Sequence, residues 1–194
     1  MKRFQIPILA LAACGLAMTA SPAAAQTARP ADAFSKQLFG GSGEHACFAR
    51  RYDAAHLASH ARQNVTSMLL LVSTAAAESG VPESYSVSIG VKFRNRKPQF
   101  DVDGFCGRAE AGLGCGVDCD GGKIDVALRD GKSVRVGIPE GARVSRPGDT
   151  SEQGERGKTF GTDDKVFRLD RTKLQDCLPV ARDAKTRACL RRGG

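Results

Sequence analysis

The sequence predicts a mainly β protein: a small antiparallel β-barrel or sandwich with short peripheral helices, crosslinked by disulfides. Apolar and polar residues alternate strictly over residues 84–94, a period of two that is typical of half-buried strands. Two further alternating runs, 124–128 and 134–138, are joined by Asp130-Gly131. An Asp-Gly pair between such runs favours a hairpin because glycine accepts a positive φ. Several short strands with closely spaced turn signals predict an all-β barrel or sandwich.

Residues 1–25 have the order of a secretory signal peptide. Lys2 and Arg3 precede an apolar run from Phe4 to Met18, and small residues at 23–25 offer a cleavage site. We expect export to the periplasm or secretion, and no transmembrane span, because the apolar run is short and interrupted. The alternative is a lipoprotein, since residues 11–14 end in Cys14, whose lipidation would anchor the chain to a membrane.

The remainder is expected to be a flexible lead-in followed by one β-rich domain. Residues 26–45 are rich in Ala, Gly, Ser and Pro, a composition typical of a flexible segment. The domain at 46–194 carries a polar stretch at 145–164, predicted to be a mobile loop, and a helical segment at 172–190. The other strands and the first helix are expected at 46–52, 65–73, 100–106, 165–170 and 53–61.

Cysteine number supports an oxidising compartment. One of the seven cysteines lies in the signal peptide, so the mature chain holds an even set. We expect three disulfides among Cys47, Cys106, Cys115, Cys119, Cys177 and Cys189. Cys177 and Cys189 are close enough in sequence to form a local bridge, and one pair is expected near the glycine-rich hairpin at 106–119. The alternative is zinc bound by Cys115, Cys119 and a third thiolate, which export disfavours because oxidation removes thiolate ligands.

Two kinds of candidate metal site can be read from the sequence. His56 and His60 are four residues apart, so a helix places both on one face, where they could bind zinc or copper with Asp53 or His45 as a third ligand. Ordinary surface histidines are the favoured interpretation because two ligands rarely suffice. The Asp-x-Asp-Gly motifs at 101–104 and 118–121 lack the remaining ligands of a calcium loop and are interpreted as turns. No cofactor is expected.

The formal net charge is +8, and basic residues cluster in two places. They lie at the tip of the first hairpin and near the C-terminus: Arg94, Arg96, Lys97, Arg187, Arg191 and Arg192. A basic surface attracts anionic partners, so an anionic envelope component or an acidic protein is the expected partner. Nucleic acid is not expected, because the chain is exported and lacks the interleaved aromatic residues on which bases stack.

The sequence therefore predicts an exported, non-enzymatic binding or interaction protein of the periplasm. Three alternatives stay open: a small-ligand carrier that uses the barrel interior, a metal-binding protein that uses His56 and His60, and an unrecognised hydrolase. The hydrolase would use Ser42 within Gly40–Gly43, but the chain has no Gly-x-Ser-x-Gly nucleophile elbow there.

Overall fold

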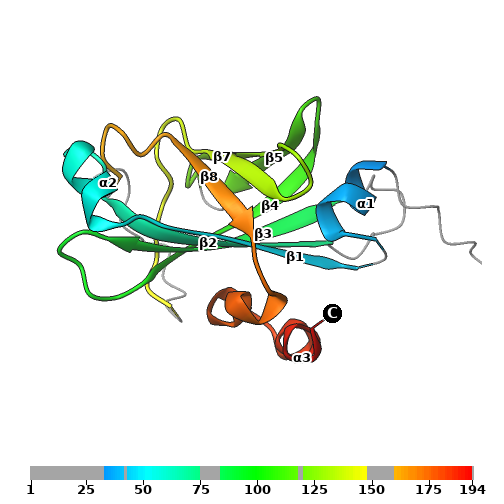
Figure 1. Ribbon diagram of the computed structural model, residues 1–194. Coiled ribbons are helices and arrows are strands. Elements are labelled where there is room, and N and C mark those ends of the chain that lie inside the picture. The colour runs from blue at the N-terminus through cyan, green and yellow to red at the C-terminus, as the bar shows by residue number, and fades with distance from the viewer. Residues whose placement is uncertain (1–32, 42, 75–83, 118–119, 148–159, 194) are drawn as a thin grey trace, which may run out of the picture. The chain divides into compact units, whose positions relative to one another are not determined.

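A closed eight-stranded antiparallel barrel is the architecture of the described chain (Figure 1). The computed structural model describes residues 33–41, 43–74, 84–117, 120–147 and 160–193. Each strand pairs with the next along the chain, and β8 returns to β1. The predicted fold class is thus confirmed, in its barrel form. The strands are β1 His45–Arg51, β2 Val65–Thr74, β3 Tyr85–Phe93, β4 Phe100–Ala109, β5 Gly112–Val117, β6 Lys123–Leu128, β7 Ser133–Gly137 and β8 Val166–Arg171.

Short helices flank the barrel, as expected. They are α1 Ala33–Phe39, α2 Ala54–Ser59, the 3-10 helix η1 Leu174–Val180 and α3 Ala184–Arg192. Asp53 begins α2 by accepting the backbone N–H of His56 at 2.7 Å, and Asp183 begins α3 in the same way with Thr186 at 2.8 Å. The signal-peptide and Cys14 predictions concern residues outside the described part of the chain.

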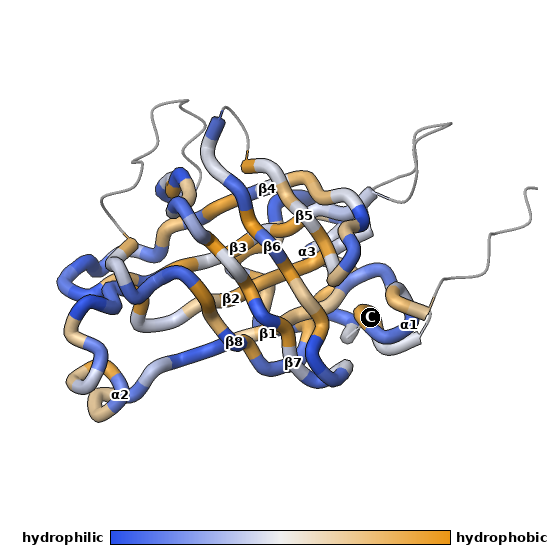
Figure 2. The backbone as a smooth tube through the Cα atoms, turned by 90° about the horizontal axis from the view of Figure 1, so that it is seen from above, coloured by the Kyte–Doolittle hydropathy of each residue, from blue (hydrophilic) through white to orange (hydrophobic). Residues whose placement is uncertain are grey.

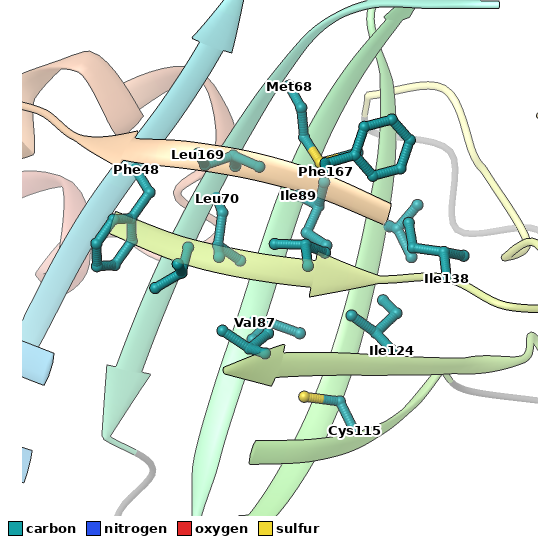
Figure 3. Packing of buried hydrophobic residues seen from close by; sticks show 14 of the residues in the cluster. Phe48, Met68, Leu70, Val87, Ile89, Cys115, Ile124, Ile138, Phe167 and Leu169 are labelled. Atoms are coloured by element: carbon teal, nitrogen blue, oxygen red, sulfur yellow. The ribbon is translucent and has the colours of Figure 1, made fainter. Parts of the chain in front are cut away.

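The barrel interior is filled by apolar side chains. Alternation along each strand turns one set of residues inward, and these pack into one cluster (Figure 3). The largest fully buried members include Phe48, Met68, Leu70, Ile89 and Phe167. Figure 2 shows the hydrophobic colouring mainly along the strands, whereas several connecting turns are hydrophilic.

A second apolar cluster covers the outer face of β1–β3. Here η1 packs against β1, β2 and β3, and α3 packs against η1, below the strands in the view of Figure 1. The cluster contains Cys47, Leu71, Cys177, Val180, Ala181 and Leu190. Strand β2 is therefore covered on both faces, which explains its nearly continuous apolar sequence.

The predicted lead-in at 26–45 is wrong for the described residues at its end, because these form α1 and the first residue of β1. Leu38 and Phe39 are buried. The Ser35 hydroxyl lies 2.8 Å from the phenol oxygen of Tyr85, and Arg171 donates to the carbonyls of residues 37 and 38. The general Ala, Gly, Ser and Pro content concealed this short apolar helix.

The prediction of a mobile loop at 145–164 is also wrong for the residues at its end, 160–164. Phe160 is buried and packs edge-on to Phe93, with ring centroids 5.3 Å apart. The Asp164 carboxylate is buried and accepts N–H groups from Gly161, Asn64 and Val65. Burial raises the pKa of Asp164, and the three N–H donors oppose that shift. Residues 160–164 therefore pack against the segment before β2.

Two disulfides crosslink the described chain. Cys106–Cys115 joins β4 to β5, as expected for a pair near the glycine-rich hairpin. The predicted Cys177–Cys189 bridge is wrong: Cys177 pairs with Cys47, 130 residues away, because η1 lies on the outer face of β1. Cys189 is a free, half-buried thiol, and Cys119 lies outside the described residues. The crosslinks indicate an oxidising, exported location.

Across the described ranges, no helix is both long enough and apolar enough to cross a membrane.

Candidate functional site

Most of the basic side chains predicted at the tip of the first hairpin make contacts within the protein. The Arg94 guanidinium donates to the backbone carbonyls of Leu57, His60 and Gln63. It thereby satisfies carbonyls at and just beyond the end of α2. The Arg96 guanidinium lies 4.4 Å from the centre of the Phe100 ring. Lys97 is exposed. Arg94 therefore fastens α2 to the hairpin, and only part of this cluster faces solvent.

The C-terminal basic residues form a separate surface. Arg187, Arg191 and Arg192 are exposed on α3, whose buried residue is Leu190. The start of α3 lies near His45, since the charges of Asp183 and Lys185 act on that imidazole. His45 begins β1, whereas α2 and Arg94 lie beyond the end of that strand. The six predicted basic residues are therefore not gathered on one surface.

His56 and His60 do lie together. Their rings stack with centroids 4.1 Å apart, and Tyr52 stacks on the other side of His56 at 4.6 Å. Nε2 of His56 lies 3.0 Å from Oε1 of Gln63, and Nδ1 of His60 lies 2.9 Å from the His56 carbonyl oxygen. Each imidazole thus has a protein partner.

Neither residue considered as a third metal ligand completes a metal site with these two imidazoles in the described part of the chain. His45, one of the two residues considered as a third ligand, lies at the opposite end of β1, where its Nδ1 is 2.8 Å from Ser73 Oγ. Asp53 is used as the N-cap of α2. Within the described ranges, no group of three or more His, Cys, Asp or Glu side chains is placed to hold a metal ion. Ser42, the residue of the hydrolase alternative, lies outside those ranges.

The described surface offers a different candidate, an open groove on the outer face of β1–β3 with a volume of about 410 Å³. Strand register builds it from two neighbouring rows. Ala49, Leu69 and Gly90 are cross-strand neighbours and form the floor row. Arg51, Ser67 and Lys92 form the next row, which we call the cation row. Alternation along the strands turns both rows outward.

The floor row forms the bottom of the groove because the residues on both sides of Leu69, Ala49 and Gly90, are small. A Cβ atom at Gly90 would lie 2.7 Å from both Gln99 Nε2 and Val180 Cγ1, so glycine is required where η1 approaches β3. Pro179 of η1 and Gln99 line the sides of the groove. Ala49 and Leu69 are half-buried, which leaves an apolar floor partly open to solvent.

The cation row carries uncompensated charge. Arg51 and Lys92 are exposed, and neither has a carboxylate partner among the described residues. Their Cα atoms are two strands apart, about 10 Å, and the two long side chains can converge over the Ser67 hydroxyl between them. This arrangement suits one anionic group that accepts from two cations and a hydroxyl.

On the β8 side of the groove, one carboxylate pairs with two guanidinium groups. Arg50 Nη1 and Arg168 Nε each lie 3.3 Å from an oxygen of Asp170, so this carboxylate is shared by two guanidinium groups. The Arg50 guanidinium also lies 5.5 Å from the centre of the Tyr52 ring. Burial raises the pKa of Tyr52, which therefore stays a neutral phenol. Arg51 and Lys92 are the groove cations that have no carboxylate partner among the described residues.

A smaller depression lies over Gly137 on the outer face of β6–β8, with a volume of about 190 Å³. Asp125, Arg135 and Lys165 line it together with the exposed Val166. Both signs of charge meet there in a small space, so it indicates no ligand class.

Sequence reasoning missed the groove. Arg51 and Lys92 lie on strands that are not sequential neighbours, and no local motif joins them. The alternation in β3 placed Lys92 on an outer face, but only the pairing of β1 with β2 and of β2 with β3 brings it beside Arg51.

The fold and its groove define a disulfide-crosslinked, up-and-down antiparallel barrel with a cationic groove on its outer face. Comparison of the chain with protein-family models, with curated proteins and with solved structures finds no match.

Proposed function

We propose that this chain is an exported, non-enzymatic binding protein of the periplasm that captures an anionic envelope component in the outer-face groove. The observation that carries this proposal is the cation row, in which Arg51 and Lys92 flank Ser67 without a carboxylate partner among the described residues. Two cations beside a hydroxyl attract and orient an anion.

The packed barrel interior supports an outer site over an inner one. The inward side chains of the strands form one apolar cluster, and its largest members are fully buried. A carrier that uses the interior, the alternative from the sequence, requires those side chains to move apart. The outer-face groove needs no rearrangement, because it is open to solvent and bordered by residues held by the barrel and η1.

The test compares vesicles of phosphatidylcholine alone with vesicles that also contain phosphatidylglycerol. The double variant Arg51→Gln/Lys92→Gln removes both free cations of the groove and keeps side chains of moderate length. We expect the unaltered protein to co-sediment with the anionic vesicles in low salt and to dissociate as salt is raised. The double variant should bind at least about tenfold more weakly, which corresponds to about 1.4 kcal/mol.

The matched control is Arg187→Gln/Arg191→Gln on α3, which removes the same charge from an exposed surface elsewhere. It should retain most of the affinity. Equal weakening by both double variants would mean that only net charge matters and would overturn the groove as the site. Greater weakening by the α3 variant would move the site to α3, as the sequence allowed.

A further inference from the structure

We propose that the occupant of the outer-face groove is an anionic lipid whose phosphate lies over the cation row and whose acyl chain lies along the floor row. This inference rests on the proposed function and specifies its ligand. It follows from the order of polar and apolar groups across the groove.

The cation row lies beside the floor row, and the Arg50–Asp170 ion pair borders the floor row on its β8 side, next to Ala49. The cation row and the floor row are two residues apart along each strand, about 7 Å. Beyond the floor row, the outer face is covered by η1, where Val180 and Cys177 belong to the second apolar cluster. Leu69 packs against that same cluster. Val180 and Cys177 are fully buried, so the apolar surface that a ligand meets beyond the cations is that of Ala49, Leu69 and Pro179.

The floor offers little to a polar occupant. Ala49, Leu69 and Pro179 present no side-chain donors or acceptors, and Gln99 Nε2 already donates to Asp101 Oδ1 at 3.0 Å. A small anion alone would satisfy Arg51 and Lys92 but leave the floor exposed to water. A saccharide would place hydroxyl groups on apolar side chains, at a cost in unpaired hydrogen bonds.

An acidic peptide fits less well for a backbone reason. Every strand of the barrel pairs with two neighbours, so the groove lies on a sheet face with no free edge to pair with an extended chain. Peptide N–H and C=O groups lying on the floor row would therefore lack partners. A hydrocarbon chain has no such requirement.

Size and side-chain chemistry agree with this occupant. The volume of about 410 Å³ falls in the range of roughly 300–1,000 Å³ that ligand sites occupy. Arg51 and Lys92 can lay their methylene stems beside a hydrocarbon chain and keep their charged ends at the phosphate. The groove is open, so we expect it to hold one chain rather than a whole diacyl lipid.

The experiment measures binding of three soluble probes by the full mature protein at concentrations below micelle formation. Lysophosphatidylglycerol carries both charge and chain, glycerol phosphate carries the charge alone, and lysophosphatidylcholine carries the chain on a zwitterionic head group. We expect the first to bind at least about tenfold more tightly than either of the others. Lengthening its chain should improve affinity by about twofold to fourfold for each methylene that the groove covers.

Two substitutions separate the chain from the charge. Ala49→Gln places a longer polar side chain in the floor, and Leu69→Asn makes the floor polar; circular dichroism identifies the variant that keeps its fold. A folded floor variant should lose the chain-length dependence and keep its weak affinity for glycerol phosphate. Arg51→Gln/Lys92→Gln should lose both.

The outcomes distinguish the two proposals. Equal affinity for glycerol phosphate and lysophosphatidylglycerol overturns the lipid and leaves anion binding in place. Tighter binding of an oligoglutamate peptide than of lysophosphatidylglycerol, lost in Arg51→Gln/Lys92→Gln, also overturns the lipid but retains the groove. Binding of lysophosphatidylglycerol that is unchanged in that double variant overturns both.

Discussion

Arg182 Nη1 and Asp101 Oδ2 lie 2.8 Å apart and fasten the C-terminal segment to β4. The other terminal nitrogen of Arg182 lies 2.7 Å from Asp103 Oδ2, so one guanidinium joins two carboxylates of the same strand. Asp101 is 1 % exposed, and Gln99 donates to its other oxygen. With the Cys47–Cys177 bridge, this contact holds η1 at two places on the outer face, where it borders the groove.

Arg182→Ala should destabilise the fold by about 1–3 kcal/mol, because it leaves the buried Asp101 carboxylate without its cation. Urea unfolding near neutral pH measures the change. Arg187→Ala, an exposed residue of α3, is the control and should stay within about 0.5 kcal/mol of the unaltered protein. Equal small effects would show that the Asp101 contact contributes no net stability.

Replacing Cys47 and Cys177 together by alanine should lower the free energy of unfolding by about 2–5 kcal/mol. The matched change at Cys106 and Cys115 should cost less, because that bridge closes 9 residues of sequence rather than 130. Urea unfolding without reductant compares the two. A larger loss from the shorter bridge would contradict this ordering.

The remaining thiols test the expectation of three disulfides. Cys119 and Cys189 are the cysteines left after Cys14 of the predicted signal peptide and the four bridged cysteines are set aside. If they pair with each other in the exported protein, alkylation of the denatured, unreduced protein labels no cysteine. Reduction before alkylation, as the control, exposes all six. Label on Cys189 in the unreduced sample would show that the third bridge does not form.

Gly90→Ala should cost about 1–3 kcal/mol, because its Cβ would press on Val180 and Gln99 where η1 meets β3. Gly107→Ala and Gly116→Ala are controls on the outer faces of β4 and β5, where a Cβ meets nothing within 4 Å. Thermal unfolding should show a clear loss only for Gly90→Ala. A neutral result there would mean that η1 can move away from β3.

Acidification should weaken the fold through His45. Burial is the main cause that lowers the pKa of its imidazole, whose Nδ1 lies 2.8 Å from Ser73 Oγ. The folded state therefore binds fewer protons than the unfolded state between that lowered pKa and about 6.5, so stability falls as pH falls through this interval.

Unfolding free energies at about pH 7.5 and pH 5.5, on either side of the ordinary histidine pKa, measure the effect. His45→Gln should lose less stability on acidification than the unaltered protein. His60→Gln, at an exposed position beyond α2, is the control. An unchanged pH dependence in His45→Gln would remove this residue as the cause.

The alternation of apolar and polar residues was sufficient to predict most strands. It failed where glycines leave one face of a strand without side chains. Residues 84–94 alternate visibly, and β3 follows that pattern. Strand β5 was not foreseen, because Gly114 and Gly116 occupy the outward positions on either side of Cys115 and blur the alternation. Helix α1 was not predicted within the lead-in, because the apolar residues of this helix gain packing partners only in the folded barrel.

The sequence by itself determined the mainly β class, most strand positions, the Asp130-Gly131 turn and a cysteine set suited to an oxidising compartment. These depend on alternation, turn chemistry and composition, which are local properties of the chain. Tertiary structure alone decided that the barrel closes, that Cys177 pairs with Cys47, and that Arg51 and Lys92 lie on either side of Ser67 in β2. Each of those depends on the register and stacking of elements distant in sequence, which no local pattern encodes.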